Sequence, residues 1–84
     1  MYGIQITSAA RKQFDKLDKR IQSRLQPKID ALAIEPRPHG VKKLEGKDDL
    51  YRIRVGDFRI VYTIEDDKLI VLVVKIADRK QVYK

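Results

Sequence analysis

The sequence predicts a single α+β domain, spanning residues 1–84, in which an antiparallel β-sheet is covered on one face by a helical hairpin. Apolar residues recur at helical spacing between positions 9 and 34. They alternate with polar residues between positions 50 and 62, and they form a continuous run between positions 69 and 76. The expected order is therefore strand, helix, helix, strand, strand, strand, and 84 residues leave too little chain for a second core.

A short strand is expected first, because the residues at positions 2, 4 and 6 are apolar and those between them are not. Ser8 is the expected N-cap of the first of two amphipathic helices, Ala9–Leu17 and Lys19–Ile34. Pro27 falls inside the second helix. Since the apolar spacing continues on both sides of this proline, we expect a kink there rather than a helix end.

A loop is expected from Glu35 to Asp49, where two prolines, two glycines and an Asp-Asp pair interrupt the apolar spacing. Loops of this length in small domains are often functional. His39 lies in this segment, but it is the only histidine and the chain has no cysteine. We therefore expect no metal site and treat His39 as an ordinary loop residue.

The segment Leu50–Tyr62 predicts a β-hairpin, because two alternating runs flank Gly56-Asp57 and glycine favours the first position of a two-residue turn. This turn places Arg54 opposite Arg59 and Arg52 opposite Val61. Alternation then gives one apolar face, which the helices should cover, made of Tyr51, Ile53, Val55, Phe58, Ile60 and Tyr62. The other face carries Arg52, Arg54 and Arg59, and we call it the arginine face.

The arginine face predicts a polyanion site, because like charges placed opposite one another on a sheet are unfavourable and no acidic residue of the hairpin relieves them. The alternative is an ordinary exposed sheet face, on which arginine is common. We expect Lys42, Lys43 and Lys47 to be solvated, but they would touch RNA phosphates if the loop that carries them folds toward this face.

The run Leu69–Ile76 predicts a central strand buried on both faces. Its register is open, because a two-residue or a three-residue turn before it would place Lys75 on opposite faces. Lys75 is therefore not assigned to the site.

The protein is strongly basic, and this charge favours an acidic protein or a nucleic acid as its partner. Lys plus Arg total 19 against 12 Asp plus Glu, which gives a formal charge of +7 and a pI near 9.8. The N-terminus has no signal-peptide pattern, and the longest apolar run is too short to span a bilayer. We expect a cytoplasmic protein that does not bind membranes.

Three segments, Val41–Gly46, Leu50–Tyr62 and Asp78–Tyr83, resemble the toxins of the RelE/ParE superfamily, and the resemblance covers essentially the whole chain. It implies the toxin of a type II toxin-antitoxin pair. For the RelE branch it implies an mRNA interferase, an endoribonuclease that cuts mRNA in the ribosomal A site without a cofactor. The implied partners are a cognate antitoxin with an acidic helical segment, mRNA and the 70S ribosome.

The resemblance also implies site residues. The basic residues of the family's second strand match Arg52 and Arg54, the arginine after the hairpin turn matches Arg59, and two C-terminal family residues match Arg79 and Tyr83. The chain departs from the family where well-studied RelE members have lysines at the positions of Arg52 and Arg54. Many relatives also have histidine at the position of Asp78.

The reaction implied is attack of a 2′-hydroxyl on the adjacent phosphate. We expect Arg59 and Arg79 to clamp the phosphate and Arg52 and Arg54 to stabilise charge, because the planar guanidinium matches phosphate. Arginine is a poor proton acceptor, so the sequence leaves the general base open. Tyr83 would orient the nucleophile, stack on a base or exchange a proton, and Asp78 is a second candidate base. Alternatively, the ribosome supplies the orientation in place of an efficient base. The alternatives are a ParE-like gyrase inhibitor and an inactive module that binds only its antitoxin or nucleic acid.

Overall fold

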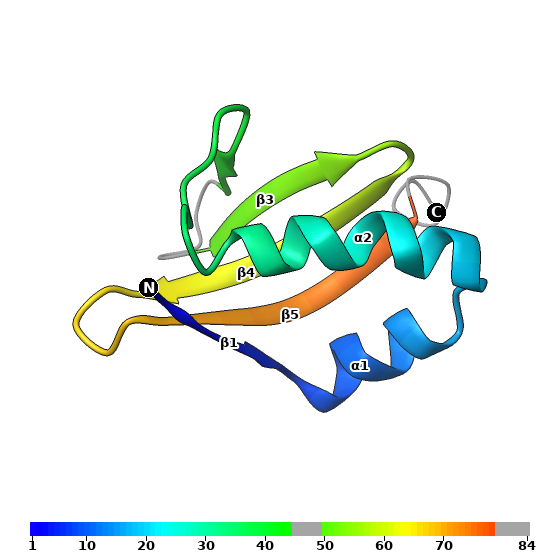
Figure 1. Ribbon diagram of the computed structural model, residues 1–84, viewed down its shortest axis with the longest axis horizontal. Helices are drawn as coiled ribbons and strands as arrows, with labels where there is room; N and C mark the ends of the chain where they lie inside the picture. The colour runs from blue at the N-terminus through cyan, green and yellow to red at the C-terminus, as the bar shows by residue number, and fades with distance from the viewer. Residues whose placement is uncertain (45–49, 79–84) are drawn as a thin grey trace.

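The computed structural model describes residues 1–44 and 50–78 and has the predicted α+β architecture. A five-stranded sheet in the order β1-β5-β4-β3-β2 is covered on one face by the two helices (Figure 1). The elements along the chain are β1 (Gly3–Ile6), α1 (Ser8–Asp15), α2 (Lys19–Ala31), β2 (Lys42–Lys43), β3 (Leu50–Val55), β4 (Phe58–Glu65) and β5 (Ile70–Asp78). The strand β2 was not predicted, because it is only two residues long and lies within the expected loop.

The sheet is mixed rather than wholly antiparallel. Strands β2 to β5 pair antiparallel as expected, but β1 runs parallel to β5, with Gly3 opposite Ile70 and Ile6 opposite Val73. A parallel pair requires a long connection between its strands, and here the two helices and the hairpin supply it. As a result, β5 lies inside the sheet between β1 and β4, as the apolar run predicted. The prediction that both faces of this strand are buried was wrong, because burial alternates: Val71 and Val73 are buried, whereas Leu72 and Val74 are half-buried and Lys75 is exposed.

Both helices begin with a side-chain cap. Thr7, rather than the predicted Ser8, caps α1, since its Oγ1 accepts a hydrogen bond from the Ala10 N–H at 3.2 Å. Asp18 caps α2 in the same way, through the Ile21 N–H at 3.0 Å.

The second helix continues through Pro27, so the proline does not end it, and the kink stays a prediction. It stops at Ala31, three residues before the predicted Ile34. The amides of residues 32 to 34 bond to carbonyls three residues back, which tightens the last turn.

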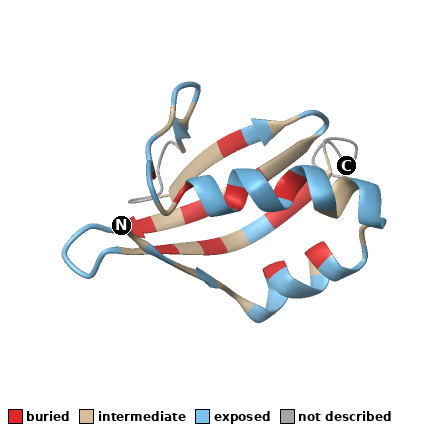
Figure 2. Cartoon of the chain, viewed as in Figure 1, coloured by how far each residue is buried: buried red, intermediate tan, exposed pale blue. Residues whose placement is uncertain are grey.

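The core lies between the helices and the sheet face that the hairpin pattern predicted. Ile53, Ile60 and Tyr62 are buried there, and the other three residues of the predicted apolar face pack against them half-buried. Figure 2 shows the buried positions along the sheet and on the helix sides that face it.

A β-bulge in β5 fixes the register that the sequence left open. Val61 lies opposite Lys75, but the next residue, Tyr62, lies opposite Val73, so Val74 is the extra residue. Beyond the bulge, the Ile76 N–H donates to Gln13 Oε1 of α1 at 2.8 Å. The bulge is therefore joined to α1, which packs on β5.

Candidate functional site

The arginine face has the register predicted for it. The turn at Gly56-Asp57 is two residues long, Arg54 lies opposite Arg59, and Arg52 lies opposite Val61. Successive side chains alternate between faces, so all three arginines lie on the sheet face away from the helices. Arg52 and Arg59 are half-buried and Arg54 is exposed.

Register separates the two lysines of β2. Lys42 lies opposite Arg52 and therefore belongs to the arginine face, whereas Lys43 lies opposite Tyr51, on the face turned toward the helices. The structure thus brings Lys42 to the predicted site and does not bring Lys43 there, and Lys47 lies outside the described residues.

The bulge in β5 brings a further lysine to the arginine face. Lys75 lies opposite Val61, which alternates with Arg59 on the side away from the helices. The uniform apolar pattern of this strand concealed the bulge, and so the sequence did not assign Lys75 to the site.

A hollow of about 230 Å³ opens beside these residues and is lined by Gly40, Lys42, Arg52 and Arg54. Three of its four lining residues are cationic. Within the described residues, no carboxylate forms an ion pair with these three or with Lys75. The hollow therefore presents positive charge that acidic groups of the described chain do not neutralise.

The C-terminal candidates have different positions. Asp78 lies opposite Phe58, so register assigns it to the face covered by the helices, where it lines a second hollow together with Gln13 and Lys16. This location separates Asp78 from the arginine face. Arg79 and Tyr83 lie outside the described residues, and their roles stay predictions.

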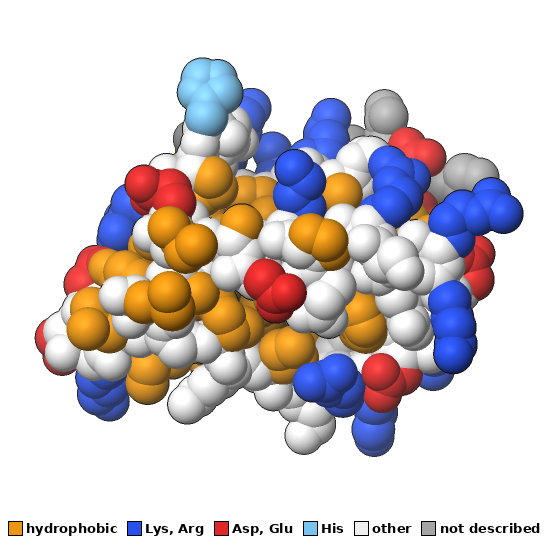
Figure 3. Space-filling view, in the orientation of Figure 1, with side chains coloured by type: hydrophobic (Ala, Val, Ile, Leu, Met, Phe, Trp, Pro, Cys, Tyr) orange, Lys and Arg blue, Asp and Glu red, His pale blue; other side chains and the backbone are white. Residues whose placement is uncertain are grey.

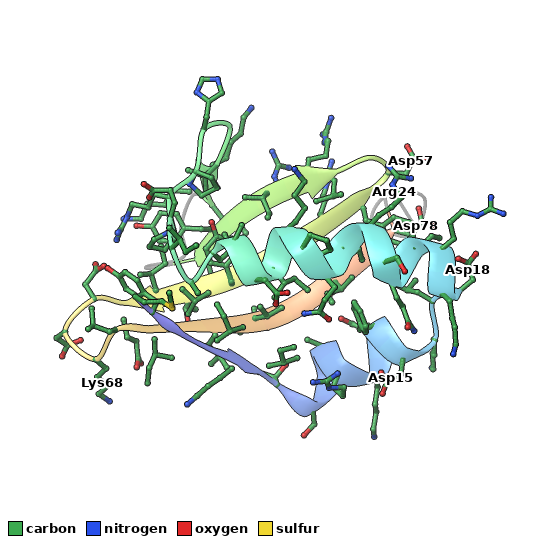
Figure 4. All side chains as sticks on the ribbon, viewed as in Figure 1. Asp15, Asp18, Arg24, Asp57, Lys68 and Asp78 are labelled. Carbon is green, nitrogen blue, oxygen red and sulfur yellow. The ribbon has the colours of Figure 1, made fainter. Side chains whose placement is uncertain are left out.

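The hairpin turn is packed against the first half of α2. Gly56 has a φ of +60°, and a β-carbon at this position would lie 2.7 Å from Arg24 Nη2. Figure 4 shows Arg24 near the turn that contains Asp57. The backbone conformation therefore favours glycine here, whereas the Arg24 guanidinium is the end of a flexible side chain and could move aside for a β-carbon.

A polar network that the sequence did not reveal secures the segment before β2. Both Nη atoms of Arg37 donate to the Asp66 carboxylate, at 3.2 and 2.9 Å, and Tyr2 donates to the same group at 2.6 Å. The guanidinium also lies 5.3 Å from the centre of the Tyr51 ring. The buried Tyr62 hydroxyl donates to the Pro36 carbonyl at 2.7 Å.

Protonation equilibria follow from these contacts. Hydrogen bonds from Arg37 and Tyr2 lower the pKa of Asp66 to about 2, and the hydrogen bond to Asp66 raises the pKa of Arg37. Burial raises the pKa of Tyr62 to about 12. Arg37 and Asp66 therefore stay charged and Tyr62 stays neutral at neutral pH, and the contacts hold the chain five residues before Lys42. The spacing of these distant residues in the sequence gave no sign that they meet.

The helix side of the molecule has a different character. Figure 3 shows hydrophobic side chains gathered over its central part, with lysines and arginines mostly toward the rim. Met1, Ile34 and Leu69 are the exposed large apolar residues of the described chain. By register, Lys42, Arg52, Arg54, Arg59 and Lys75 lie on the opposite side of the sheet.

The described residues contain no group of three histidine, cysteine or acidic side chains able to hold a metal ion. His39 is exposed in the segment between α2 and β2. No helix in the described part of the chain is long and apolar enough to cross a membrane.

Two helices on one face of a mixed sheet, with cationic residues on the other face, define a toxin of the RelE/ParE superfamily. The intact RelBE toxin-antitoxin complex of Escherichia coli matches with a TM-score of 0.82 and 28% identity, covering 93% of this chain and 96% of that chain. The RelE-RelB complex of Pyrococcus horikoshii matches with a TM-score of 0.82 and 32% identity, covering 93% and 94%.

The family model described as ParE toxin of the type II toxin-antitoxin system matches residues 4–83, and the chain belongs to this family. A putative RelE-like toxin protein of Escherichia coli is 34% identical over 82 residues, covering 95% of this chain and 85% of the relative. The mRNA interferase toxin RelE of the same species is 29% identical with the same coverage.

Proposed function

We propose that this toxin is an mRNA interferase that cuts mRNA in the A site of the 70S ribosome. The observation that carries the proposal is the convergence of Arg52, Arg54 and Arg59 on a sheet face that the helices leave uncovered. Relatives named mRNA interferase over nearly the whole chain support it. The site of action would be the cytoplasm, where ribosomes are found.

The proposed reaction joins the 2′-oxygen of a nucleotide to the adjacent phosphorus and breaks the bond to the 5′-oxygen. It yields a 2′,3′-cyclic phosphate and a 5′-hydroxyl. A base removes the 2′ proton and an acid protonates the leaving oxygen. Arg59, with Arg79, would stabilise charge on the non-bridging oxygens, and Arg52 and Arg54 would hold the flanking backbone.

Tyr83 is the better candidate for proton exchange, since register places Asp78 on the opposite face from Arg59. A cognate antitoxin would neutralise the toxin, as the solved complexes of relatives with their antitoxins support.

The test compares Arg59→Ala and Arg59→Lys with wild type in cleavage of mRNA on purified ribosomes. Loss of a positioned charge-stabilising group lowers kcat by about a hundredfold to a thousandfold, so the kcat of Arg59→Ala should be lower than that of wild type by a factor in this range. Arg59→Lys should be intermediate, because an ammonium keeps the charge but loses the planar fork. Arg11→Ala is the matched control, since it removes an exposed arginine from α1 on the far side of the sheet. Full cleavage by Arg59→Ala would refute the clamp.

A further inference from the structure

Lys75 is the residue that neither sequence motifs nor the proposed chemistry uses, yet the bulge places it on the arginine face. It ends a row of four residues, one from each of β2, β3, β4 and β5, that lie opposite one another across the sheet: Lys42, Arg52, Val61 and Lys75. We call these four residues the second row. The row nearer the hairpin turn contains Arg54 and Arg59.

The spacing within the second row suits a single phosphate. Neighbouring strands lie about 4.8 Å apart, so Arg52 and Lys75 flank Val61 with their backbones roughly 10 Å apart. Val61 is short and uncharged, and it leaves the space above it to the two long cationic side chains. A phosphate above Val61 is therefore within reach of both.

The spacing between rows suits successive phosphates. Same-face residues on one strand are two positions apart, or about 6.7 Å, which separates Arg52 from Arg54 and Val61 from Arg59. An RNA strand that places one phosphate over the row containing Arg54 and Arg59 and continues along the sheet brings the next phosphate over the second row.

We propose that the second row binds the phosphate next to the scissile one and that Lys75 is an RNA-binding residue of this site. The inference rests on the proposed function and extends it by placing the path of the RNA along β4, away from the hairpin turn. RNA fits better than an acidic protein segment, because the two rows repeat at a regular interval, as the charges of a nucleic acid backbone do.

The experiment measures KM and kcat for ribosome-bound mRNA with Lys75→Ala, Lys75→Arg and wild type. Loss of one exposed phosphate contact should raise KM about two- to fivefold and leave kcat within twofold. The salt slope of single-stranded RNA binding should fall by about 0.7. Lys75→Arg should restore KM, because it retains the charge, and Lys12→Ala should match wild type, because Lys12 lies on α1.

A second arm uses an mRNA with one neutral methylphosphonate next to the scissile position. This change should raise KM for wild type and have little further effect on Lys75→Ala. If wild type cuts the mRNA and the KM of Lys75→Ala is unchanged, the proposal that the second row binds phosphate is wrong. The proposed function would be unaffected by this result. Weakened antitoxin binding with unchanged KM would also overturn phosphate binding by the second row, in favour of a protein contact. Intact mRNA with wild type would overturn the proposed function and this inference together.

Discussion

At the scale of single residues, the arginine face places like charges side by side. Arg54 and Arg59 are direct cross-strand neighbours, an arrangement that costs a few tenths to about 1 kcal/mol on an exposed sheet. A phosphate bound between them offsets this repulsion, because its negative charge attracts both guanidinium groups. An anion at this position is therefore electrostatically favourable.

Lys42 and Lys43 allow a sharp test of face assignment, because they are adjacent, exposed and equally charged. Lys42 lies beside Arg52, whereas Lys43 faces the other way. We expect Lys42→Ala to weaken binding of single-stranded RNA about two- to fivefold and Lys43→Ala to change it less than twofold. Fluorescence anisotropy at fixed salt measures both. Equal losses would mean that only net charge matters.

Asp66 makes stability depend on acidity. Its pKa of about 2 in the folded protein is below the ordinary value of 3.8, so the unfolded chain takes up a proton first as pH falls. The stabilisation is complete above about pH 4 and is lost as pH falls toward 2. Thermal unfolding from pH 6 to pH 2 should show a larger loss for wild type than for Asp66→Asn. Parallel curves would exclude the contribution of the Arg37 contact.

At the scale of elements, the hairpin could be predicted in full because three local signals agree. Alternation fixed the faces, the Gly-Asp pair fixed the turn, and together they fixed the register. Both helices were predicted, but their ends were not. Thr7 rather than Ser8 is the N-cap of α1, and a tighter last turn ends α2 before the predicted residue. The register of β5 could not be predicted, because an uninterrupted apolar run does not indicate where a bulge lies.

The hairpin turn depends on glycine. Gly56→Ala should destabilise the protein by about 1–2 kcal/mol through the left-handed backbone conformation, because the nearby Arg24 guanidinium can move aside. Gly3→Ala is the matched control, because its β-carbon would meet only Leu69 O at an ordinary 3.9 Å. Urea unfolding of the two variants measures the difference. Similar midpoints would contradict the requirement at Gly56.

The bulge depends on α1. Gln13→Leu should cost about 1–3 kcal/mol, because it leaves the N–H of buried Ile76 without its acceptor. Gln13→Glu keeps an accepting oxygen and should unfold close to wild type. If the bulge also loosens in Gln13→Leu, amide exchange at residues 74 to 76 should accelerate. Unchanged stability and exchange would show that Gln13 is not needed there.

At the scale of the whole molecule, the sheet separates two surfaces of different chemistry. The helices cover the apolar face, and the other face collects cations from β2, β3, β4 and β5. The sequence predicted this division, but not the parallel placement of β1 or the Arg37 network. Both depend on contacts between residues far apart in the chain, such as Tyr2 with Asp66, which no local pattern encodes.

The central claim is that this uncovered cationic face cuts RNA. The most direct measurement incubates the purified wild-type toxin in parallel with mRNA-programmed 70S ribosomes and with DNA gyrase acting on relaxed plasmid. We predict mRNA fragments with 2′,3′-cyclic phosphate and 5′-hydroxyl ends, together with normal supercoiling. Intact mRNA with inhibited supercoiling would contradict the account and would identify the chain as a gyrase inhibitor.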